Sequence, residues 1–276
     1  MPLQAETLST SHGAISLADT GGTGPALLMI HGNSARKEIF RHQFASDLPA
    51  RYRLLAFDLP GHGASADAAE PERSYTWAGY AELAAEILAA RGIATAAVLG
   101  WSLGGHIGIE MIHQGKLALT GMVLTGTPPV PNDVSAIGRA FHTSPVMDLT
   151  GAAHFTAEQA ELYCRHTCGL GVPLDAEIVA GYARTDGRAR TTMFDSVLAL
   201  EMADQAAVVA GTGVPVAVIS GGDESFVNND YLGRCSYGNL WRETVFVLPG
   251  IGHAPFWEAP QRFNPLLAAF LEEVGG

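Results

Sequence analysis

The sequence has few charged residues and nothing that suggests disorder. Charged residues make up 16% of its 276 positions, against 47% hydrophobic ones. This balance, with 32 Gly and 15 Pro along the chain, is typical of a compact, turn-rich globular protein and excludes a chain that is disordered throughout. The length suits one large α/β domain or two small ones, because a domain commonly has about 100–200 residues.

Basic residues are the minority among the charged ones. The sequence has 16 Lys and Arg against 28 Asp and Glu, a formal net charge of −12. Phosphate backbones and anionic lipid surfaces repel such a chain. We therefore expect no nucleic acid and no membrane as a partner. The expected partner is a small-molecule substrate, and we expect a monomer or weak homodimer.

Long apolar runs are absent. Spanning a bilayer takes about 20 consecutive apolar residues, whereas the strongest runs, at 26–30 and 214–219, have the length of strands. Residues 1–12 are polar and lack the charged and apolar regions of a signal peptide. We therefore expect a cytoplasmic protein.

Cysteine is scarce. The chain has three cysteines, Cys164, Cys168 and Cys235, without the spaced pairs of a zinc site or a redox motif. It also has no histidine-rich motif of the kind that holds a catalytic metal. We therefore expect reduced, structural thiols, no metal and no cofactor.

What the sequence does contain is an alternation of short β-rich runs with helical patterns. The expected strands of the first half are 26–30, 52–58, 96–99 and 122–124. The expected helices are 38–48, 80–88 and 103–113. Strands that alternate with helices predict crossover units, and hence a mostly parallel sheet covered on both faces.

Between residues 130 and 211 the strand pattern gives way to helical signals. One helix there begins with Thr156 and Gln159, which have the spacing of a capping box, and ends at Gly169. Two further strands follow, at 214–220 and 244–248, and then a C-terminal helix.

The predicted fold class is therefore α/β, with a mostly parallel sheet, flanking helices and an inserted helical cap. We expect the core domain to comprise residues 1–129 and 212–276, and the cap to comprise residues 130–211.

Residues 100–104, Gly-Trp-Ser-Leu-Gly, form the only Gly-x-Ser-x-Gly of the chain, between an expected strand and an expected helix. In a nucleophile elbow this sharp turn raises the Ser hydroxyl above the sheet, and the glycines let strand and helix approach closely. Ser102 is therefore the candidate nucleophile.

A serine hydroxyl needs a base, and His253 follows the last expected strand in a Gly- and Pro-rich turn at 249–255. That turn belongs at the carboxyl edge of the sheet, where Ser102 also emerges. His106 and His113 lie along one helix, and we expect structural roles for them.

The base in turn needs an acid that fixes its tautomer. Asp223 and Glu224 both come just after the expected strand 214–220, so the chain order is Ser, acid, His, as in α/β-hydrolases. Glu224 lies three residues after Gly221 and two before an apolar pair, a spacing common in that fold. Glu224 is the favoured acid and Asp223 the alternative.

An oxyanion hole completes the expected machinery. The segment His31-Gly32-Asn33-Ser34 follows the first buried strand. The backbone N–H of Asn33 can therefore join that of Leu103, at the start of a helix, in facing a developing oxyanion.

Over essentially its whole length the chain resembles the α/β-hydrolase superfamily. More narrowly, it resembles the metal-independent N-acyl-homoserine lactonases of that fold, which are quorum-quenching enzymes. Five segments carry the narrower resemblance: 31–34, 100–110 (GWSLGGHIGIE), 125–130 (TGTPPV), 184–190 (RTDGRAR) and 252–256 (GHAPF). The chain departs from the family pattern around the acid, at Gly222, Ser225 and the run after Asn228.

The resemblance implies a serine hydrolase that opens the lactone ring, and it assigns the site residues. The implied triad is Ser102, His253 and Glu224. The implied oxyanion donors are Asn33 and Leu103. The residues implied to contact substrate are Tyr163 of the cap, Gly32 and Trp101. Apolar cap residues expected to line an acyl-chain tunnel are Phe141, Val146, Met147, Phe155, Leu162, Met193 and Phe194.

Two other functions share this pattern. A general carboxylesterase, or another small-ester hydrolase, has the same catalytic features. A ligand receptor on a hydrolase scaffold would keep the fold without turnover. Dehalogenases and epoxide hydrolases of this fold use an aspartate nucleophile, which Ser102 excludes.

Overall fold

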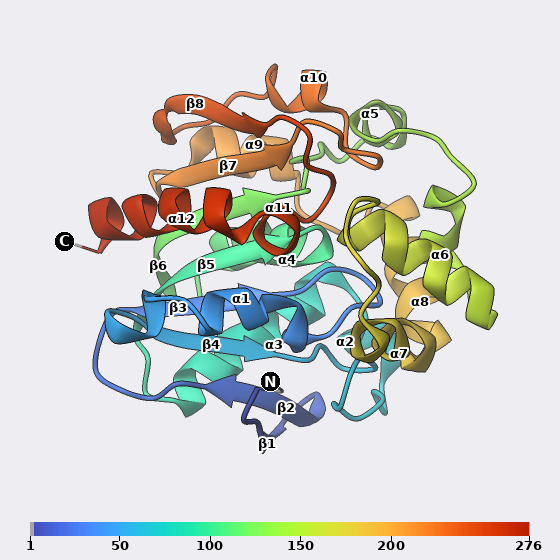
Figure 1. Cartoon of the computed structure of the whole chain (residues 1–276), viewed down its shortest axis with the longest axis horizontal. Helices are drawn as coiled ribbons and strands as arrows, with labels where there is room; N and C mark the ends of the chain where they lie inside the picture. The colour runs from blue at the N-terminus through green and yellow to red at the C-terminus, as the bar shows by residue number, and fades with distance from the viewer. Residues whose placement is uncertain (1–2, 276) are drawn as a thin grey trace.

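The computed structural model describes residues 3–275; residues 1, 2 and 276, which the predicted core segments include, lie outside the described residues. Its centre is an eight-stranded sheet in the order β1-β2-β4-β3-β5-β6-β7-β8 (Figure 1). Strand β2 pairs antiparallel with β1 and β4, and the strands from β4 to β8 pair in parallel. The predicted α/β class with a mostly parallel sheet is confirmed.

Every strand expected from the sequence is present, and an N-terminal hairpin is added. The strands are β1 (Glu6–Thr10), β2 (Gly13–Asp19), β3 (Ala26–Ile30), β4 (Arg53–Phe57), β5 (Thr95–Trp101), β6 (Ala118–Thr125), β7 (Val216–Gly221) and β8 (Leu240–Leu248). The hairpin β1–β2 was not expected because β1 has no fully buried position. Only a short stretch of β2 that includes Ile15 and Leu17 is buried, too little for a clear alternating pattern.

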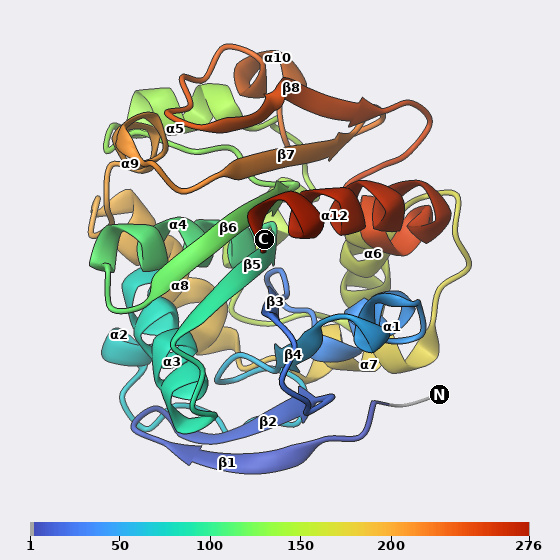
Figure 2. The ribbon, with the colours of Figure 1, turned by 90° about the vertical axis from the view of Figure 1, so that its left-hand side faces the viewer.

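Helices cover both faces of the sheet. They are α1 (Arg41–Phe44), α2 (Pro71–Ser74), α3 (Trp77–Ala90), α4 (Leu103–Gln114), α5 (Val134–Ala140), α6 (Ala157–Cys168), α7 (Ala176–Arg184), α8 (Gly187–Leu198), α9 (Gln205–Gly211), α10 (Asn229–Leu232), α11 (Pro255–Glu258) and α12 (Pro260–Val274), with 3-10 turns η1 (Lys37–Phe40), η2 (Leu48–Ala50) and η3 (Met147–Gly151). Figure 2 shows α3, α4 and α9 on one side of the sheet and α1 and α12 on the other. None of the helices within residues 3–275 is long and apolar enough to cross a membrane.

The prediction of one continuous helix at 38–48 is wrong. The structure has η1, α1 and η2 there instead. Ser46 interrupts the helix, because its hydroxyl donates to the carbonyl of Gln43 (2.7 Å) and accepts from the N–H of Leu48 (3.2 Å). A serine that bonds its own backbone in this way competes with helical hydrogen bonds.

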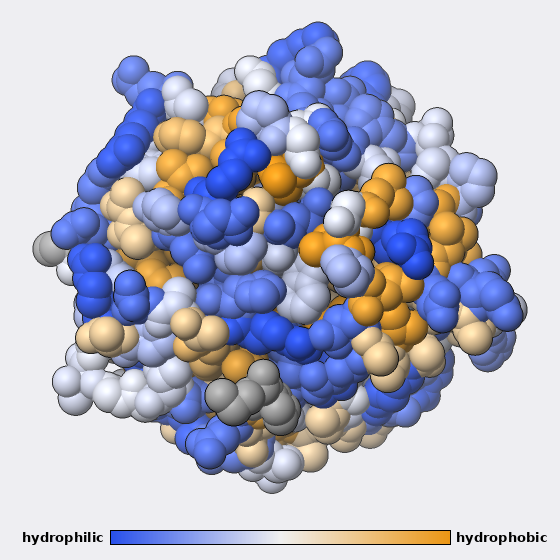
Figure 3. Space-filling view, in the orientation of Figure 1, coloured by the Kyte–Doolittle hydropathy of each residue, from blue (hydrophilic) through white to orange (hydrophobic). Residues whose placement is uncertain are grey.

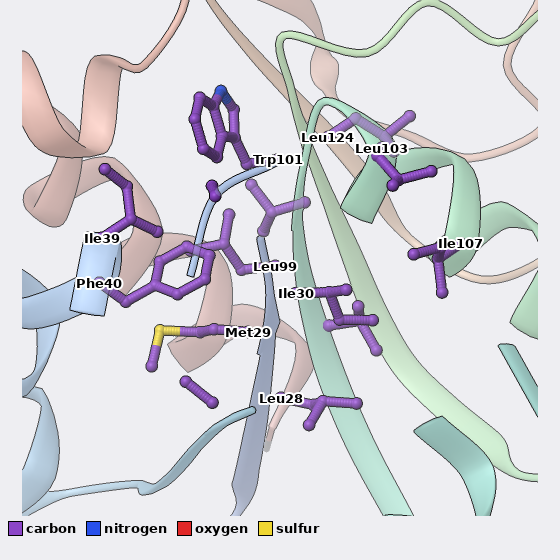
Figure 4. Close-up of a cluster of buried hydrophobic side chains, with 14 of the residues drawn as sticks. Leu28, Met29, Ile30, Ile39, Phe40, Leu99, Trp101, Leu103, Ile107 and Leu124 are labelled. Carbon is purple, nitrogen blue, oxygen red and sulfur yellow. The ribbon is translucent and has the colours of Figure 1, made fainter. Parts of the chain in front are cut away.

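The core continues on both sides of the central strands. All five residues of β3 are buried, as expected of a strand covered on both faces. Figure 4 shows Met29 pointing toward Ile39 and Phe40, and Ile30 pointing to the side where Ile107 of α4 lies. The alternation of side chains along β3 thus joins the two helical layers through one core.

Helices α5 to α9 and η3 follow one another between β6 and β7 without an intervening strand. The expected capping box is present: Thr156 and Gln159 bond one another's backbone, and α6 ends at Gly169. Figure 1 shows α6, α7 and α8 beside the carboxyl ends of the strands. Apolar surface gathers over this side of the molecule (Figure 3). The bounds 130–211 for a cap stay a prediction.

Close approach between β3 and α4 fixes the region around Ser102. A Cβ atom at Gly104 would lie 2.0 Å from the carbonyl oxygen of Ile30, and one at Gly100 would lie 2.4 Å from the carbonyl oxygen of Gly104. Real Cβ atoms do not approach backbone oxygens this closely, so strand and helix can pack in this way only around glycine.

We expect Gly104→Ala to lower the free energy of unfolding by about 1–3 kcal/mol, because the added methyl group forces α4 away from β3. Thermal unfolding followed by circular dichroism measures the effect. Gly211→Ala is the matched control, since a Cβ at Gly211 meets nothing within 4 Å. Equal melting temperatures for the two variants would show that the contact between α4 and β3 is not tight.

Candidate active site

Ser102 stands in a strained turn between β5 and α4. Its backbone has φ 54° and ψ −118°, a conformation that costs energy in a residue other than glycine. The Ser102 N–H donates to the carbonyl of Thr125 (2.9 Å), and the Thr127 hydroxyl donates to the carbonyl of Ser102 (2.8 Å). The turn is therefore held from both sides. Sequence reasoning missed Thr127, although it lies in the quoted segment 125–130.

His253 and Glu224 form a buried pair. The two carboxylate oxygens of Glu224 lie 2.9 and 2.7 Å from His253 Nδ1, and the side chains are 3% and 1% exposed for histidine and glutamate. A carboxylate at this position accepts the proton of Nδ1 and leaves Nε2 free to act as the base. The N–H of Phe226 donates to Glu224 Oε1 (2.8 Å) and holds the carboxylate in place.

The structure separates the two candidate acids. Glu224 contacts His253, whereas Asp223 is exposed and its backbone N–H donates to the carbonyl of Ile251 (2.8 Å). The predicted preference for Glu224 therefore agrees with the geometry, and its role as the triad acid is a proposal.

Two side chains that sequence reasoning did not place here hold the loop of His253. Trp101 Nε1 donates to the carbonyl of His253 (2.9 Å). Glu258 accepts the backbone N–H of Gly252 (3.0 Å) and that of Ala254 (3.1 Å), one with each carboxylate oxygen. Burial raises the pKa of Glu258. The residues on both sides of His253 are thus tied to one carboxylate.

The loop 31–34, in which the sequence predicts an oxyanion donor and which we call the oxyanion loop, lies against the elbow. His31 Nδ1 donates to the carbonyl of Gly32 (2.8 Å) and its Nε2 accepts the N–H of Leu59 (3.0 Å). Burial lowers the pKa of His31 to about 4, so the ring stays neutral and keeps both bonds. A Cβ at Gly32 would lie 3.1 Å from Ser102 Cβ, which places this loop beside the candidate nucleophile.

The N–H groups of Asn33 and Leu103 have no acceptor among residues 3–275. Leu103 begins α4, so its N–H lies at the positive end of a helix dipole. Both residues line the same cavity as Ser102. Two free donors of this kind can stabilise a developing oxyanion.

The cavity has a volume of about 240 Å³, and both Ser102 and His253 line it. Its other lining residues are Asn33, Trp77, Leu103, His106, Ile137, Gly138, Phe141, His142, Thr143, Met147, Thr150, Tyr163, Thr167, Met193, Phe194, Val197 and Phe226. The wall is mainly apolar, with few polar groups, as in a site for a small molecule that has an apolar part.

The expected tunnel residues divide into two groups. Phe141, Met147, Met193 and Phe194 line the cavity. The remaining three are not among its lining residues: Val146 is buried, Phe155 packs under the Arg190 guanidinium, and Leu162 is 44% exposed. Sequence reasoning placed these three by residue type alone, and their direction follows from helix packing.

Of the three residues expected to contact substrate, one lines the cavity and two do not. Tyr163 lines the cavity, whereas Gly32 and Trp101 are not among its lining residues and support the elbow and the His253 loop. The Tyr163 hydroxyl lies 3.3 Å from Thr150 Oγ1, and burial raises the pKa of this phenol, which keeps it a hydrogen-bond donor. The Asn33 side chain donates to the carbonyl of Thr150 (2.9 Å), which links the oxyanion loop to η3.

Possible metal ligands are not gathered here. Within residues 3–275 no group of three His, Cys, Asp or Glu side chains could hold a metal ion. Cys164, Cys168 and Cys235 are free thiols. Of the two histidines expected to be structural, His113 is exposed, whereas His106 lines the cavity.

The sequence matches the model of the alpha/beta hydrolase family over residues 27–266. The chain belongs to the alpha/beta hydrolase family. The pimeloyl-[acyl-carrier protein] methyl ester esterase of Chromobacterium violaceum is 29% identical over 259 residues, which cover 92% of this chain and 97% of that protein. The esterase RhEst1 from Rhodococcus sp. ECU1013, at 24% identity and a TM-score of 0.78 over 99% of this chain and all of that one, shares the fold.

This hydrolase is more similar to solved structures of N-acyl homoserine lactonase AidH. The complex of AidH with N-butanoyl homoserine is 43% identical, with a TM-score of 0.94 over 99% of this chain and 97% of that one. A complex with N-hexanoyl homoserine lactone is 42% identical, with the same TM-score, over 99% of this chain and 98% of that one. The resemblance predicted from the sequence motifs is confirmed.

We expect Glu224→Gln to lower kcat by at least about a hundredfold, because an amide cannot stabilise the imidazolium and favours the wrong tautomer of His253. Asp223→Asn is the matched control and should change kcat less than about twofold, because Asp223 is exposed. Steady-state kinetics with an aryl ester, with melting temperatures recorded for both variants, measure the effect. The reverse order of losses would assign the acid to Asp223.

Proposed function

We propose that this hydrolase opens the ring of N-acyl-homoserine lactones, with Ser102, His253 and Glu224 as its catalytic triad. The observation that carries the proposal is the match to AidH over 99% of the chain at a TM-score of 0.94. The buried Glu224–His253 pair, of which His253 lines the same cavity as Ser102, supplies the chemistry that such a reaction needs. Removal of acyl-homoserine lactones is quorum quenching.

The reaction begins with attack by Ser102 Oγ on the ring carbonyl carbon. His253 Nε2 takes the hydroxyl proton, and the Glu224 carboxylate stabilises the imidazolium that results. The carbonyl oxygen becomes an oxyanion, which accepts hydrogen bonds from the N–H groups of Asn33 and Leu103. Both donor residues line the same cavity as Ser102.

Collapse of the tetrahedral intermediate breaks the bond between the carbonyl carbon and the ring oxygen. The His253 imidazolium gives its proton to that oxygen, so the product is an ester of Ser102 that still carries the released hydroxyl on its acyl part. Water, deprotonated by His253, then attacks this ester and frees Ser102. Hydrolysis competes with re-closure of the ring, so a wall that holds the tethered hydroxyl away from the ester favours the forward reaction.

The apolar wall suits the acyl chain of such a substrate. Phe141, Met147, Met193 and Phe194 line the cavity, and burial of each methylene of an acyl chain contributes about 0.8 kcal/mol. Methionine adapts its shape to the chain that it contacts. We propose that these four residues bind the acyl chain.

The proposal also covers the oligomeric state and the location of the protein. One chain supplies the triad, the oxyanion donors and the cavity wall, which supports a monomer or weak homodimer. A cytoplasmic location stays a prediction.

We expect the purified protein to open a panel of N-acyl-homoserine lactones of different acyl length, with release of one proton per turnover. Acidification of the products should regenerate the parent lactones, because a ring-opened hydroxy acid re-closes in acid and an amide-cleaved product does not. Liquid chromatography with mass spectrometry follows both steps. Turnover of simple aryl esters without turnover of any lactone would identify a general carboxylesterase instead, and turnover of neither would favour a ligand receptor.

We expect Tyr163→Phe to lower kcat/KM for the lactone by about three- to tenfold, because it removes one hydrogen-bond donor from the cavity. Tyr182→Phe is the matched control: its hydroxyl bonds Thr167 (2.6 Å), and Tyr182 is not among the residues that line the cavity. Tyr182→Phe should lower the melting temperature and leave kcat/KM nearly unchanged. An unchanged kcat/KM for Tyr163→Phe would make Tyr163 a packing residue.

A further inference from the structure

His106 is a polar side chain of the cavity wall to which the mechanism gives no role. His106 lies on α4 and is 5% exposed, and it lines the cavity together with Ser102 and Phe141. Its imidazole stacks on the Trp77 indole, with ring centroids 4.1 Å apart and an angle of 5° between the planes. The ring is thus fixed in orientation, in a cavity whose wall is mainly apolar.

Gln205 of α9 fixes the tautomer of His106. Gln205 Nε2 donates to the backbone carbonyl of His106 (3.0 Å), so Gln205 Oε1 is the amide atom that faces the imidazole. That oxygen lies 2.7 Å from His106 Nδ1 and can only accept. The proton of the neutral ring therefore resides on Nδ1, and Nε2 carries a lone pair.

Nε2 has no hydrogen-bond partner within residues 3–275, and it is not sealed in the interior. Burial lowers the pKa of His106 to about 4, so the ring remains neutral at the pH of the cell. The cavity wall therefore offers a hydrogen-bond acceptor at this point and no donor.

The position of His106 relative to Ser102 limits what this acceptor can reach. The His106 N–H donates to the Ser102 carbonyl (3.4 Å), so the two residues are about one turn apart, a rise of about 6 Å. Side chains of a helix lean toward its N-terminus, which brings the His106 ring toward Ser102. In an acyl-homoserine lactone the amide nitrogen is two bonds from the carbonyl carbon that Ser102 attacks, so its N–H is also held near Ser102, the residue toward which the His106 ring leans.

We propose that His106 Nε2 accepts a hydrogen bond from the amide N–H of the substrate, and that the Gln205–His106 pair thereby selects esters with an acylamino group next to the scissile carbonyl. This inference rests on the proposed function for the identity of the substrate. A lactone or ester without the N–H leaves Nε2 unpaired in an apolar wall, which costs binding free energy. Gln205 is a positioning residue, and His106 is a substrate-binding residue.

The test compares two lactones that differ in one group, N-hexanoyl-homoserine lactone and its analogue with CH₂ in place of N–H. We expect the wild type to prefer the amide by about five- to tenfold in kcat/KM. In His106→Asn the side-chain amide can keep the bond to Gln205 but has no atom at the place of Nε2, so the preference should fall to less than about twofold.

Two variants control this comparison. In His106→Gln the side-chain amide reaches the place of Nε2 with its oxygen, so most of the preference should return. His113→Asn makes the same substitution at an exposed position of the same helix and should keep the full preference. A folded His106→Asn that retains the wild-type preference would overturn the proposal.

A measurement that does not depend on His106→Asn covers the case in which that variant does not fold. In Ser102→Ala labelled with ¹⁵N-histidine, the Nε2 resonance of His106, identified by its absence from His106→Gln, should move when the amide lactone is added and stay in place with the CH₂ analogue. Equal movement with both ligands, or with neither, contradicts the hydrogen bond.

The same variants separate this proposal from the proposed function. If the wild type opens no lactone, the lactonase assignment fails. The aryl ester of N-hexanoylglycine and its CH₂ analogue then provide the matched pair, because their N–H has the same position relative to the scissile carbonyl. A preference that depends on His106 in this pair supports the acceptor role, and its absence refutes it.

Discussion

The turn at Ser102 is the constraint on which the rest of the structure depends. A non-glycine residue with φ 54° persists only where its surroundings determine the backbone completely. Here the carbonyl of Thr125 and the hydroxyl of Thr127 bind the Ser102 backbone, and glycines at 100 and 104 let β5, α4 and β3 meet without a methyl group between them. As a result, the Ser102 hydroxyl emerges from a rigid part of the molecule, next to the first free N–H of α4.

Around this fixed point the chain arranges two further loops with buried polar contacts. Glu258 ties the residues before and after His253, and His31 ties the loop that carries Asn33. Asn33 in turn bonds the carbonyl of Thr150 in η3. Charges and dipoles act strongly in such a place because little water screens them, so a small displacement of either loop is expected to reduce catalysis more than stability.

Local patterns made much of this structure predictable from the sequence. The elbow has a fixed motif, and buried parallel strands have recognisable lengths and turns, so Ser102, His253 and the ends of the strands could be located. Glu224 could be preferred to Asp223 by its spacing from Gly221. The hairpin β1–β2 could not be predicted, because few of its residues are buried. The interruption at Ser46 could not be predicted either, because it depends on a side chain that competes with the backbone. Glu258, Thr127 and the pairing of His106 with Gln205, 99 positions apart, depend on contacts that only the folded chain creates.

The central claim is that Ser102 is the nucleophile that opens the lactone. The most direct test is the rate of proton release from N-hexanoyl-homoserine lactone by Ser102→Ala, relative to the wild type, with both proteins shown to be folded. Removal of a triad nucleophile leaves only binding and the oxyanion donors, so we expect the rate to fall by a factor of about 10³ or more. A rate above about a tenth of the wild-type value would contradict covalent catalysis by Ser102.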